Sequence, residues 1–218
     1  MEDQDRNNSQ HLTQFLTTEH FTLQGARNAT ISEANGRLGH YLSIVGSAIV
    51  ALAFVANVSS LGEAFFAFAL IILPVIILLG FVTLIRTMQI NIDYARLTQA
   101  INRIRHYYVD QAPDGKPYFS YPYYDDPESM LDAMMPFHFP LQSLASTPGP
   151  VILINSVLAG VFFGIMGARL FGLGLNSAIL VSLPGLILSL LLHMLLARRL
   201  WSKASQEALE VRFPPPEQ

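Results

Sequence analysis

Hydrophobic residues are concentrated in four blocks of the chain from which charged residues are absent. These blocks are Leu38–Gly62, Ala64–Ile85, Pro148–Ala168 and Leu170–Ala197. Each is long enough for the roughly 20 residues that a helix needs to cross about 30 Å of hydrocarbon. We therefore predict four transmembrane helices, at about 39–58, 63–85, 150–169 and 175–197. Buried core helices of a soluble protein are the alternative, but such helices need polar faces, which these blocks almost entirely lack.

Positive charges lie almost entirely on one side of these predicted helices. Twelve of the 13 basic residues precede the first helix, lie between the second and third, or follow the fourth, and only Arg169 lies on the other side. Lys and Arg are enriched in cytoplasmic loops. We therefore predict a multi-pass protein of the cell (inner) membrane with both termini and the middle segment in the cytoplasm.

The pattern divides the chain into five segments and predicts an all-α membrane protein with four transmembrane helices in two hairpins and cytoplasmic helical extensions. The segments are a cytoplasmic tail and amphipathic helix (1–37), a transmembrane hairpin (38–85), a cytoplasmic helix with a tyrosine-rich loop (86–149), a second transmembrane hairpin (150–197) and a cytoplasmic helix and tail (198–218). Residues 1–10 are polar, which predicts disorder. Apolar residues between Leu12 and Gly36 predict an amphipathic helix.

The second transmembrane helix is predicted to continue well beyond the membrane, from about Glu63 to Tyr108. No Pro or Gly occurs between Arg86 and Pro113, and apolar residues recur at alternating spacings of four and three: Ile90, Tyr94, Leu97, Ile101, Ile104 and Tyr108. This 3.5-residue repeat predicts a seam for another helix. The N-terminal or C-terminal helix of the same chain could fill the seam, or copies of the protein could join along it as a stalk.

The tyrosine-rich loop is expected to be ordered. Six of the eight tyrosines lie between 107 and 124, whereas disordered linkers are poor in aromatic residues. The sequence Asp126-Pro127-Glu128 is typical of a helix start, and a short helix to about Met135 follows. The acidic residues here could instead bind a divalent cation, with this ligand set: Asp125, Asp126, Glu128, Asp132 and His138. A capped, solvated helix start explains them better. The fourth membrane helix is expected to continue to about Val211.

Composition leaves little chemistry available. Charged residues make up 13% of the chain, well below the roughly 25% of soluble proteins, and a net charge of −3 provides no basic field for nucleic acid. The absence of Cys excludes disulfides, thiolate catalysis and Cys-ligated metals. No zinc-hydrolase, nucleophile-elbow or phosphate-loop motif occurs. We therefore expect no catalytic residues, metal or cofactor, and an enzyme acting on lipid is disfavoured.

Small and polar residues form stripes on the predicted membrane helices. One stripe has a small residue at every fourth position: Ser156, Gly160, Gly164 and Ala168. Such a face lets two helix backbones approach closely, either inside one bundle or between copies in an oligomer. A second stripe, formed by His40, Ser43 and Ser47, is the candidate lining of an aqueous pathway.

Ionisable residues near the predicted membrane helices are candidates for function. His40 and His193 lie near cytoplasmic helix ends, where a His usually reaches the interface, so a pH-sensing role is the less favoured interpretation. Glu63 and Arg169 are the only acid and the only base on the outer side. An ion pair joining the two hairpins is favoured over a ring of several Glu63 copies that attracts cations.

Two segments carry a resemblance to a known group of proteins. Thr17-Thr-Glu-His-Phe-Thr-Leu-Gln-Gly-Ala-Arg-Asn-Ala-Thr-Ile-Ser-Glu-Ala-Asn-Gly-Arg37, followed at once by a membrane helix, and Asn102-Arg-Ile-Arg-His-Tyr-Tyr108 resemble small bacterial four-helix integral membrane proteins. The resemblance implies a bacterial integral membrane protein and no activity or site.

Two functional hypotheses follow from the sequence. The first is a homo-oligomeric channel or membrane-permeabilising protein, based on the short outer loops, the small-residue face and the stalk-like helix. Small multi-helix membrane proteins also serve as effectors of bacterial defence systems, an analogy of architecture alone. The second is a membrane scaffold or accessory subunit that docks a cytoplasmic protein partner through residues 86–149. The expected partners are the lipid bilayer, further copies of the chain and this cytoplasmic protein.

Overall fold

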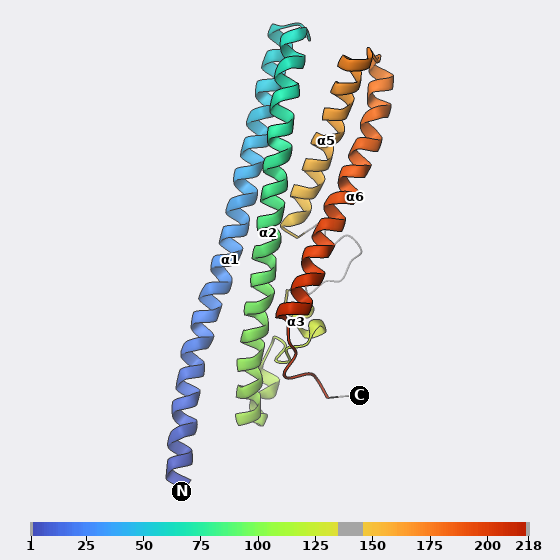
Figure 1. Cartoon of the computed structure of the whole chain (residues 1–218). Coiled ribbons are helices and arrows are strands. Elements are labelled where there is room, and N and C mark those ends of the chain that lie inside the picture. The colour runs from blue at the N-terminus through green and yellow to red at the C-terminus, as the bar shows by residue number, and fades with distance from the viewer. Residues whose placement is uncertain (1, 135–145, 217–218) are drawn as a thin grey trace. The chain divides into compact units, whose positions relative to one another are not determined.

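The computed structural model describes residues 2–134 and 146–216, and within these ranges every regular element is a helix (Figure 1). The elements are α1 (Glu2–Val58), α2 (Glu63–Gln111), the 3-10 helix η1 (Pro113–Tyr118), α3 (Pro127–Met134), α5 (Pro148–Phe171) and α6 (Leu175–Ala208). Among the described residues, the four long helices α1, α2, α5 and α6 are each long and apolar enough to cross a membrane. The predicted all-helical class and its four apolar helices are therefore confirmed.

The chain divides into two compact units. The apolar unit contains Ala34–Gln89 and Pro140–Ser202, and the polar unit contains Met1–Glu33, Ile90–Phe139 and Lys203–Gln218. Helices α1, α2 and α6 each contribute residues to both units, whereas α5 belongs to the apolar unit alone.

The predicted disorder of residues 1–10 is wrong, because α1 begins at Glu2 and continues without interruption to Val58. Polar residues do not by themselves prevent a helix, since backbone hydrogen bonds form whatever the side chains are. No Gly or Pro occurs before Gly25. Hydroxyl groups also bond to backbone carbonyls one turn earlier, as Thr13 Oγ1 does to Ser9 O at 2.9 Å and Thr17 Oγ1 to Thr13 O at 2.8 Å.

Helix α2 runs from Glu63 to Gln111, as the uninterrupted pattern predicts. Helix α6, in contrast, ends at Ala208 and not near Val211. The reason lies in the polar unit, where the backbone N–H groups of Arg212 and Phe213 donate to the carboxylate of Asp125. These N–H groups are therefore not used to extend the helix.

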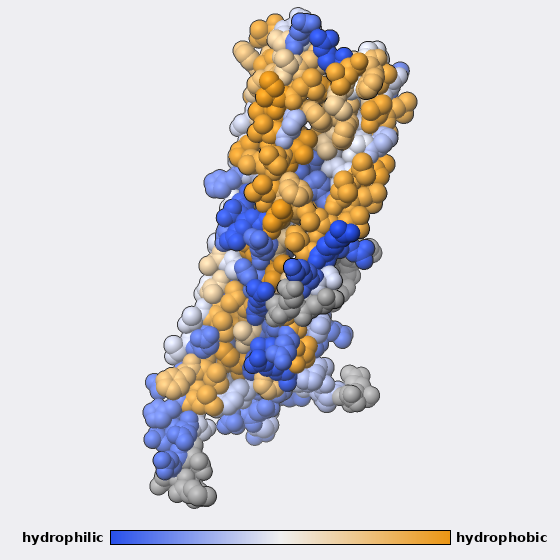
Figure 2. Space-filling view, in the orientation of Figure 1, coloured by the Kyte–Doolittle hydropathy of each residue, from blue (hydrophilic) through white to orange (hydrophobic). Residues whose placement is uncertain are grey.

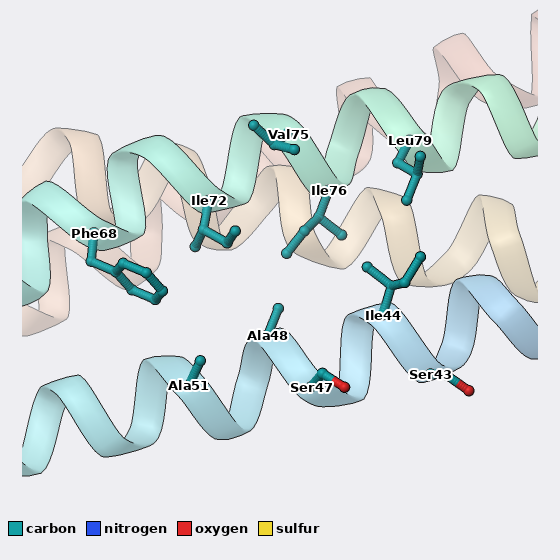
Figure 3. A pocket seen from close by; sticks show the side chains of 10 residues that line it. All are labelled: Ser43, Ile44, Ser47, Ala48, Ala51, Phe68, Ile72, Val75, Ile76 and Leu79. Atoms are coloured by element: carbon teal, nitrogen blue, oxygen red, sulfur yellow. The ribbon is translucent and has the colours of Figure 1, made fainter.

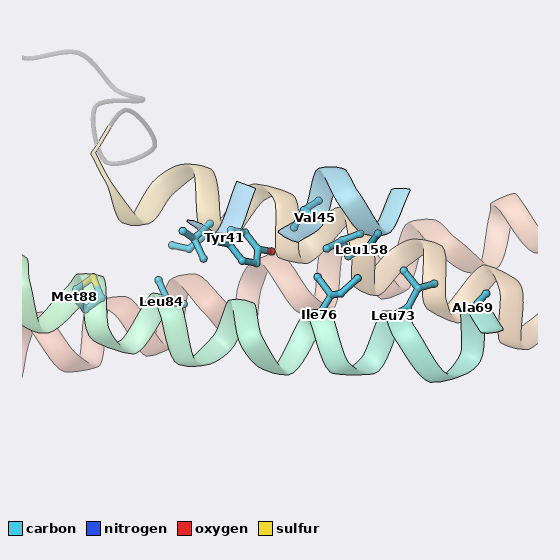
Figure 4. Close-up of a cluster of buried hydrophobic side chains, with 11 residues drawn as sticks. Tyr41, Val45, Ala69, Leu73, Ile76, Leu84, Met88 and Leu158 are labelled. Atoms are coloured by element: carbon cyan, nitrogen blue, oxygen red, sulfur yellow. The ribbon is translucent and has the colours of Figure 1, made fainter. Parts of the chain in front are cut away.

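In the apolar unit, α5 is the most enclosed helix, with half of its most hydrophobic window buried, against 11% for α6. The core side chains come from three helices (Figure 4) and are these: Tyr41, Val45, Ala48, Ala69, Leu73, Ile76, Leu84, Met88, Val151, Ile152 and Leu158. Many large hydrophobic side chains of α1, α2 and α6 remain exposed, and Figure 2 shows hydrophobic residues over much of the visible surface of this unit. Such a surface suits contact with lipid better than contact with water.

Short connections join the helices of the apolar unit. Ser60 and Leu61 adopt positive φ angles of 48° and 58° between α1 and α2. Gly62 follows, where a Cβ atom would lie 2.8 Å from the carbonyl oxygen of Ser59. Gly172, with φ of 63°, ends α5 in the left-handed conformation that favours glycine. Both connections are too short to form a domain of their own.

Candidate functional site

A buried polar cluster joins all four helices of the apolar unit. Its centre is Asn155 on α5, whose side chain is fully buried. The hydroxyl of Tyr41 on α1 donates to Asn155 Oδ1 at 3.3 Å. The amide nitrogen Nδ2 of Asn155 lies 3.1 Å from the carbonyl oxygen of Ile77 on α2 and 3.0 Å from Nε2 of His193 on α6. One side chain thus holds partners on the three other long helices.

The geometry defines which nitrogen of His193 carries the proton in this arrangement. Nδ1 lies 2.7 Å from the carbonyl oxygen of Ser189, which can only accept a hydrogen bond, so Nδ1 is the donor. Nε2 is then free to accept from Asn155 Nδ2, whose second hydrogen goes to Ile77 O. Every polar atom of the Asn155 amide therefore has a hydrogen-bond partner in the cluster.

Gly80 on α2 makes room for this cluster. A Cβ atom at position 80 would lie 2.4 Å from Asn155 Oδ1 and 2.8 Å from the hydroxyl of Tyr41. Interhelical hydrogen bonds between buried polar side chains stabilise membrane helix bundles by about 0.5–2 kcal/mol each. The hydroxyl of Ser189 also lies 3.2 Å from His193 Nδ1. Because the contacts of Asn155 join α5 to the three other long helices, the cluster holds these helices together.

The small-residue stripe of α5 packs against α6 of the same chain. A Cβ atom on Gly160 would lie 2.9 Å from Leu186 Cβ and from the carbonyl oxygen of Ser182. A Cβ atom on Gly164 would lie 3.1 Å from the carbonyl oxygen of Ala178. Ser156 is also buried, and Ala168 is partly buried. Within one chain, this face therefore packs against α6.

The candidate pathway residues His40, Ser43 and Ser47 are exposed on α1. Ser43 and Ser47 border a groove of about 420 Å³ between α1 and α2, whereas His40 is not among its lining residues. Figure 3 shows Ala48 of α1 facing Ile72 and Ile76 of α2 across this groove. The groove is mainly hydrophobic, and the hydroxyl of Ser43 already donates to Gly39 O at 2.9 Å. One chain therefore encloses no polar channel along this stripe.

Glu63 and Arg169 form an ion pair, with 3.1 Å between Arg169 Nη2 and Glu63 Oε1. It links the start of α2 to the end of α5 within the apolar unit. Both side chains are largely exposed, so the pair contributes at most about 1 kcal/mol.

In the polar unit, Asp125 holds three separate segments together, an arrangement that we call the Asp125 clamp. Its fully buried carboxylate accepts a hydrogen bond from Arg103 Nε on α2 at 2.7 Å. It also accepts from the backbone N–H groups of Arg212 and Phe213, at 3.0 Å and 2.7 Å. Burial by itself raises the pKa of Asp125, but these hydrogen bonds outweigh it and hold the pKa below its ordinary value.

Neighbouring amides of α2 extend this clamp. Gln99 Nε2 donates to the backbone carbonyls of Asp125 and Glu210, at 2.9 Å and 3.0 Å. Asn102 Nδ2 donates to Tyr124 O at 2.9 Å, and Arg103 also bonds to Glu210 O. The tyrosine-rich loop and the C-terminal segment are thus both fastened to α2 by buried polar groups.

Asp125 and Asp126 have structural partners. Asp126 caps α3, because its Oδ2 accepts from the backbone N–H groups of Glu128 and Ser129 at 3.1 Å. Asp125 is occupied by the clamp, and His138 lies outside the described residues. Among the residues that the structure describes, no group of three or more His, Asp and Glu side chains is placed to hold a metal ion.

The predicted seam of α2 is covered within one chain. Ile90, Ile101 and Ile104 are buried, and Tyr94, Leu97 and Tyr108 are partly buried. Helix α1 contacts this face, since the hydroxyl of Tyr108 donates to Thr17 Oγ1 at 3.4 Å. Within one chain, α1 thus covers part of the seam, as the intramolecular alternative expects.

Sequence reasoning missed Asn155, Tyr41 and Asp125 as central residues. An Asn inside an otherwise charge-free apolar helix is a signal that could have pointed to the polar cluster. No local pattern distinguishes Asp125 from the acidic residues beside it, because its role depends on Arg212 and Phe213, which lie 87 and 88 residues further along.

Comparisons with protein-family models, with curated proteins and with solved structures found no match to this chain.

Proposed function

We propose that the four apolar helices cross the cell membrane as two hairpins, α1 with α2 and α5 with α6, and that the polar unit and both termini lie in the cytoplasm. The exposed hydrophobic surface of the apolar unit supports insertion, and the position of 12 of the 13 basic residues supports this orientation. The chain has no Cys, so single cysteines report its topology directly. Ser60→Cys should be labelled only from outside, and Ser120→Cys only from inside. The reverse pattern would contradict the orientation.

We further propose that the protein is a membrane scaffold or accessory subunit that presents its polar unit to a cytoplasmic protein. The Asp125 clamp is the observation that carries this proposal. Its buried hydrogen bonds fasten the tyrosine-rich loop to α2 and so hold the loop in one conformation. The ordered loop leaves Tyr118 and Tyr121 exposed, at 86% and 56% of their surfaces. Exposed aromatic side chains on an ordered backbone are typical anchors of protein interfaces.

Photo-cross-linking in cells tests the docking function. A photoreactive residue in place of Tyr118 should give a discrete protein adduct, and Asp125→Asn should abolish that adduct because the loop loses its fixed conformation. The same probe at Val50, an exposed position of α1 in the apolar unit, is the matched control and should not give this adduct. Equal cross-linking with and without Asp125→Asn would contradict the role of the clamp.

A homo-oligomeric channel or permeabilising protein is the second candidate. The exposed positions of Ser43 and Ser47 on α1 are the observation that favours it, because further copies of the chain could complete a polar lining there. The seam and the small-residue face both have partner helices within one chain, so they do not by themselves favour an oligomer. Light scattering in detergent and in nanodiscs measures the oligomeric state, and liposomes measure ion flux. A stable monomer without flux would exclude this candidate, whereas flux that falls in Ser47→Leu would favour it.

A further inference from the structure

Two arginines and a histidine face one another in the polar unit, and none of them pairs with an acidic residue of the described part of the chain. On α1, His20, Gln24 and Arg27 share one helix face, and His20 Nε2 lies 2.6 Å from Gln24 Nε2. On α2, Tyr94, Arg105 and Tyr108 share the face that meets it. The guanidinium of Arg27 lies 5.8 Å from the ring centre of Tyr94, and the rings of His20 and Tyr108 are 6.0 Å apart. Arg105 therefore lies between two contacts that join α1 to α2.

Two buried nitrogen atoms of this cluster make no hydrogen bond to any described residue. Arg27 Nε and His20 Nδ1 are buried and have no hydrogen-bond partner. Arg105 has a long contact of 3.4 Å to Asn102 Oδ1 and covers the ring of Tyr121 at 5.2 Å. Neighbouring basic groups have acids of their own, since Arg96 pairs with Asp93, Arg103 with Asp125 and His106 with Asp110. Within the described part of the chain, no carboxylate pairs with Arg27 or Arg105.

The basic groups of this cluster repel one another. Burial, together with the positive charges of Arg105 and Arg27, lowers the pKa of His20. Burial and the charge of Arg27 likewise lower the pKa of Arg105, although the nearby Tyr121 acts in the opposite direction. Like charges that are partly removed from water destabilise one another, and a bound anion would relieve this repulsion.

We propose that His20, Arg27 and Arg105 form a binding site for a phosphate group. A phosphate dianion matches the two guanidinium charges, and its oxygens accept the paired N–H donors that a planar guanidinium offers. The unpartnered Nδ1 of His20 supplies a third donor when the ring nitrogen carries hydrogen. The phosphate belongs either to a free phosphorylated molecule or to a lipid headgroup.

Two experiments distinguish these sources of the phosphate group. Binding of inorganic pyrophosphate to the full-length protein in phosphatidylcholine nanodiscs tests a free phosphorylated molecule. The thermal stability of the protein in nanodiscs that contain phosphatidic acid tests a lipid headgroup. If the ligand is a free phosphorylated molecule, we expect saturable binding of pyrophosphate. If it is a lipid headgroup, we expect a higher Tm with phosphatidic acid than with phosphatidylcholine alone. Arg27→Gln and Arg105→Gln should each weaken the response by about tenfold or more, because each removes charge-assisted hydrogen bonds. Arg96→Gln removes one charge from the same helix and is the matched control, which should leave the response unchanged.

Two further readouts separate an anion site from a structural cluster. Without ligand, Arg105→Gln should leave Tm unchanged or raise it, because it relieves repulsion, whereas a structural arginine would lower it. In NMR titrations of labelled histidines, the ligand should raise the pKa of His20 and leave the other five unchanged.

Any of three results would overturn the proposal. One is the absence of a response to pyrophosphate up to about 10 mM together with no effect of phosphatidic acid. Another is an equal loss of response in Arg96→Gln. The third is a dimer whose partner carboxylate neutralises the two arginines.

Discussion

Replacing Gly80 with Ala tests whether the buried polar cluster locks the apolar unit. In an isolated helix this change stabilises by about 0.5–1 kcal/mol, because Ala restricts the unfolded chain. At position 80, however, the new Cβ would lie 2.4 Å from Asn155 Oδ1 and 2.6 Å from Asn155 Cγ. These atoms belong to a fully buried amide with bonds to Tyr41, Ile77 and His193, so the side chain has no free direction in which to move.

The magnitude follows from two costs and one gain. Overpacking of a closed core costs about 1–3 kcal/mol, and each buried polar group left without a partner costs about 1–3 kcal/mol. After subtraction of the helix gain, we expect Gly80→Ala to lower the free energy of unfolding by about 1–5 kcal/mol. Denaturant-induced unfolding in detergent, followed by tryptophan fluorescence of Trp201, measures this difference.

Gly46→Ala is the matched control for this prediction. Gly46 lies inside α1, and a Cβ there meets no atom within 4 Å, so the substitution should be neutral or slightly stabilising. Asn155→Ala removes the obstructing amide, and Gly80→Ala should therefore cost less in that background, with a coupling of about 0.5–3 kcal/mol. Equal stability of Gly80→Ala and Gly46→Ala would refute the argument.

Four further predictions concern the other contacts. Asp125→Asn should destabilise the polar unit by about 2–3 kcal/mol, because Arg103 loses its buried partner, and hydrogen exchange of the Arg212 and Phe213 amides should accelerate. Since the pKa of Asp125 is lowered in the folded state, the stability it adds is fully present above the ordinary value of about 3.9 and is lost as pH falls through the lowered folded-state pKa; amide protection of Phe213 should collapse at that lower pH in the wild type but show no such step in Asp125→Asn. Gly160→Leu should destabilise the bundle by at least about 1–3 kcal/mol, as overpacking against α6, whereas Gly36→Leu, where a Cβ meets nothing within 4 Å, should not; equal Tm values would contradict this packing. Glu63→Gln should change stability by no more than about 1 kcal/mol, and a larger loss would show that this exposed ion pair is underestimated.

The sequence by itself determined the elements that depend on local composition. Hydrocarbon length and the absence of charge are properties of about 20 consecutive residues, so the four apolar helices could be predicted before any contact was known. The continuity of α2 to Gln111 was predictable for the same reason, because a helix continues where no breaker occurs. The predicted disorder of residues 1–10 was wrong because a polar composition is typical of disordered segments but does not by itself break a helix.

Only the tertiary structure decided which faces meet. The stripe around Gly160 and the seam around Ile101 are equally suited to a partner helix in the same chain or in another copy, since periodicity describes one surface and not its complement. The Asn155 cluster and the Asp125 clamp join residues that are 22 to 114 positions apart, and their hydrogen bonds exist only after the helices have packed. A buried polar group must find such partners to offset its desolvation, so these long-range contacts, which no local pattern records, select one arrangement of the helices.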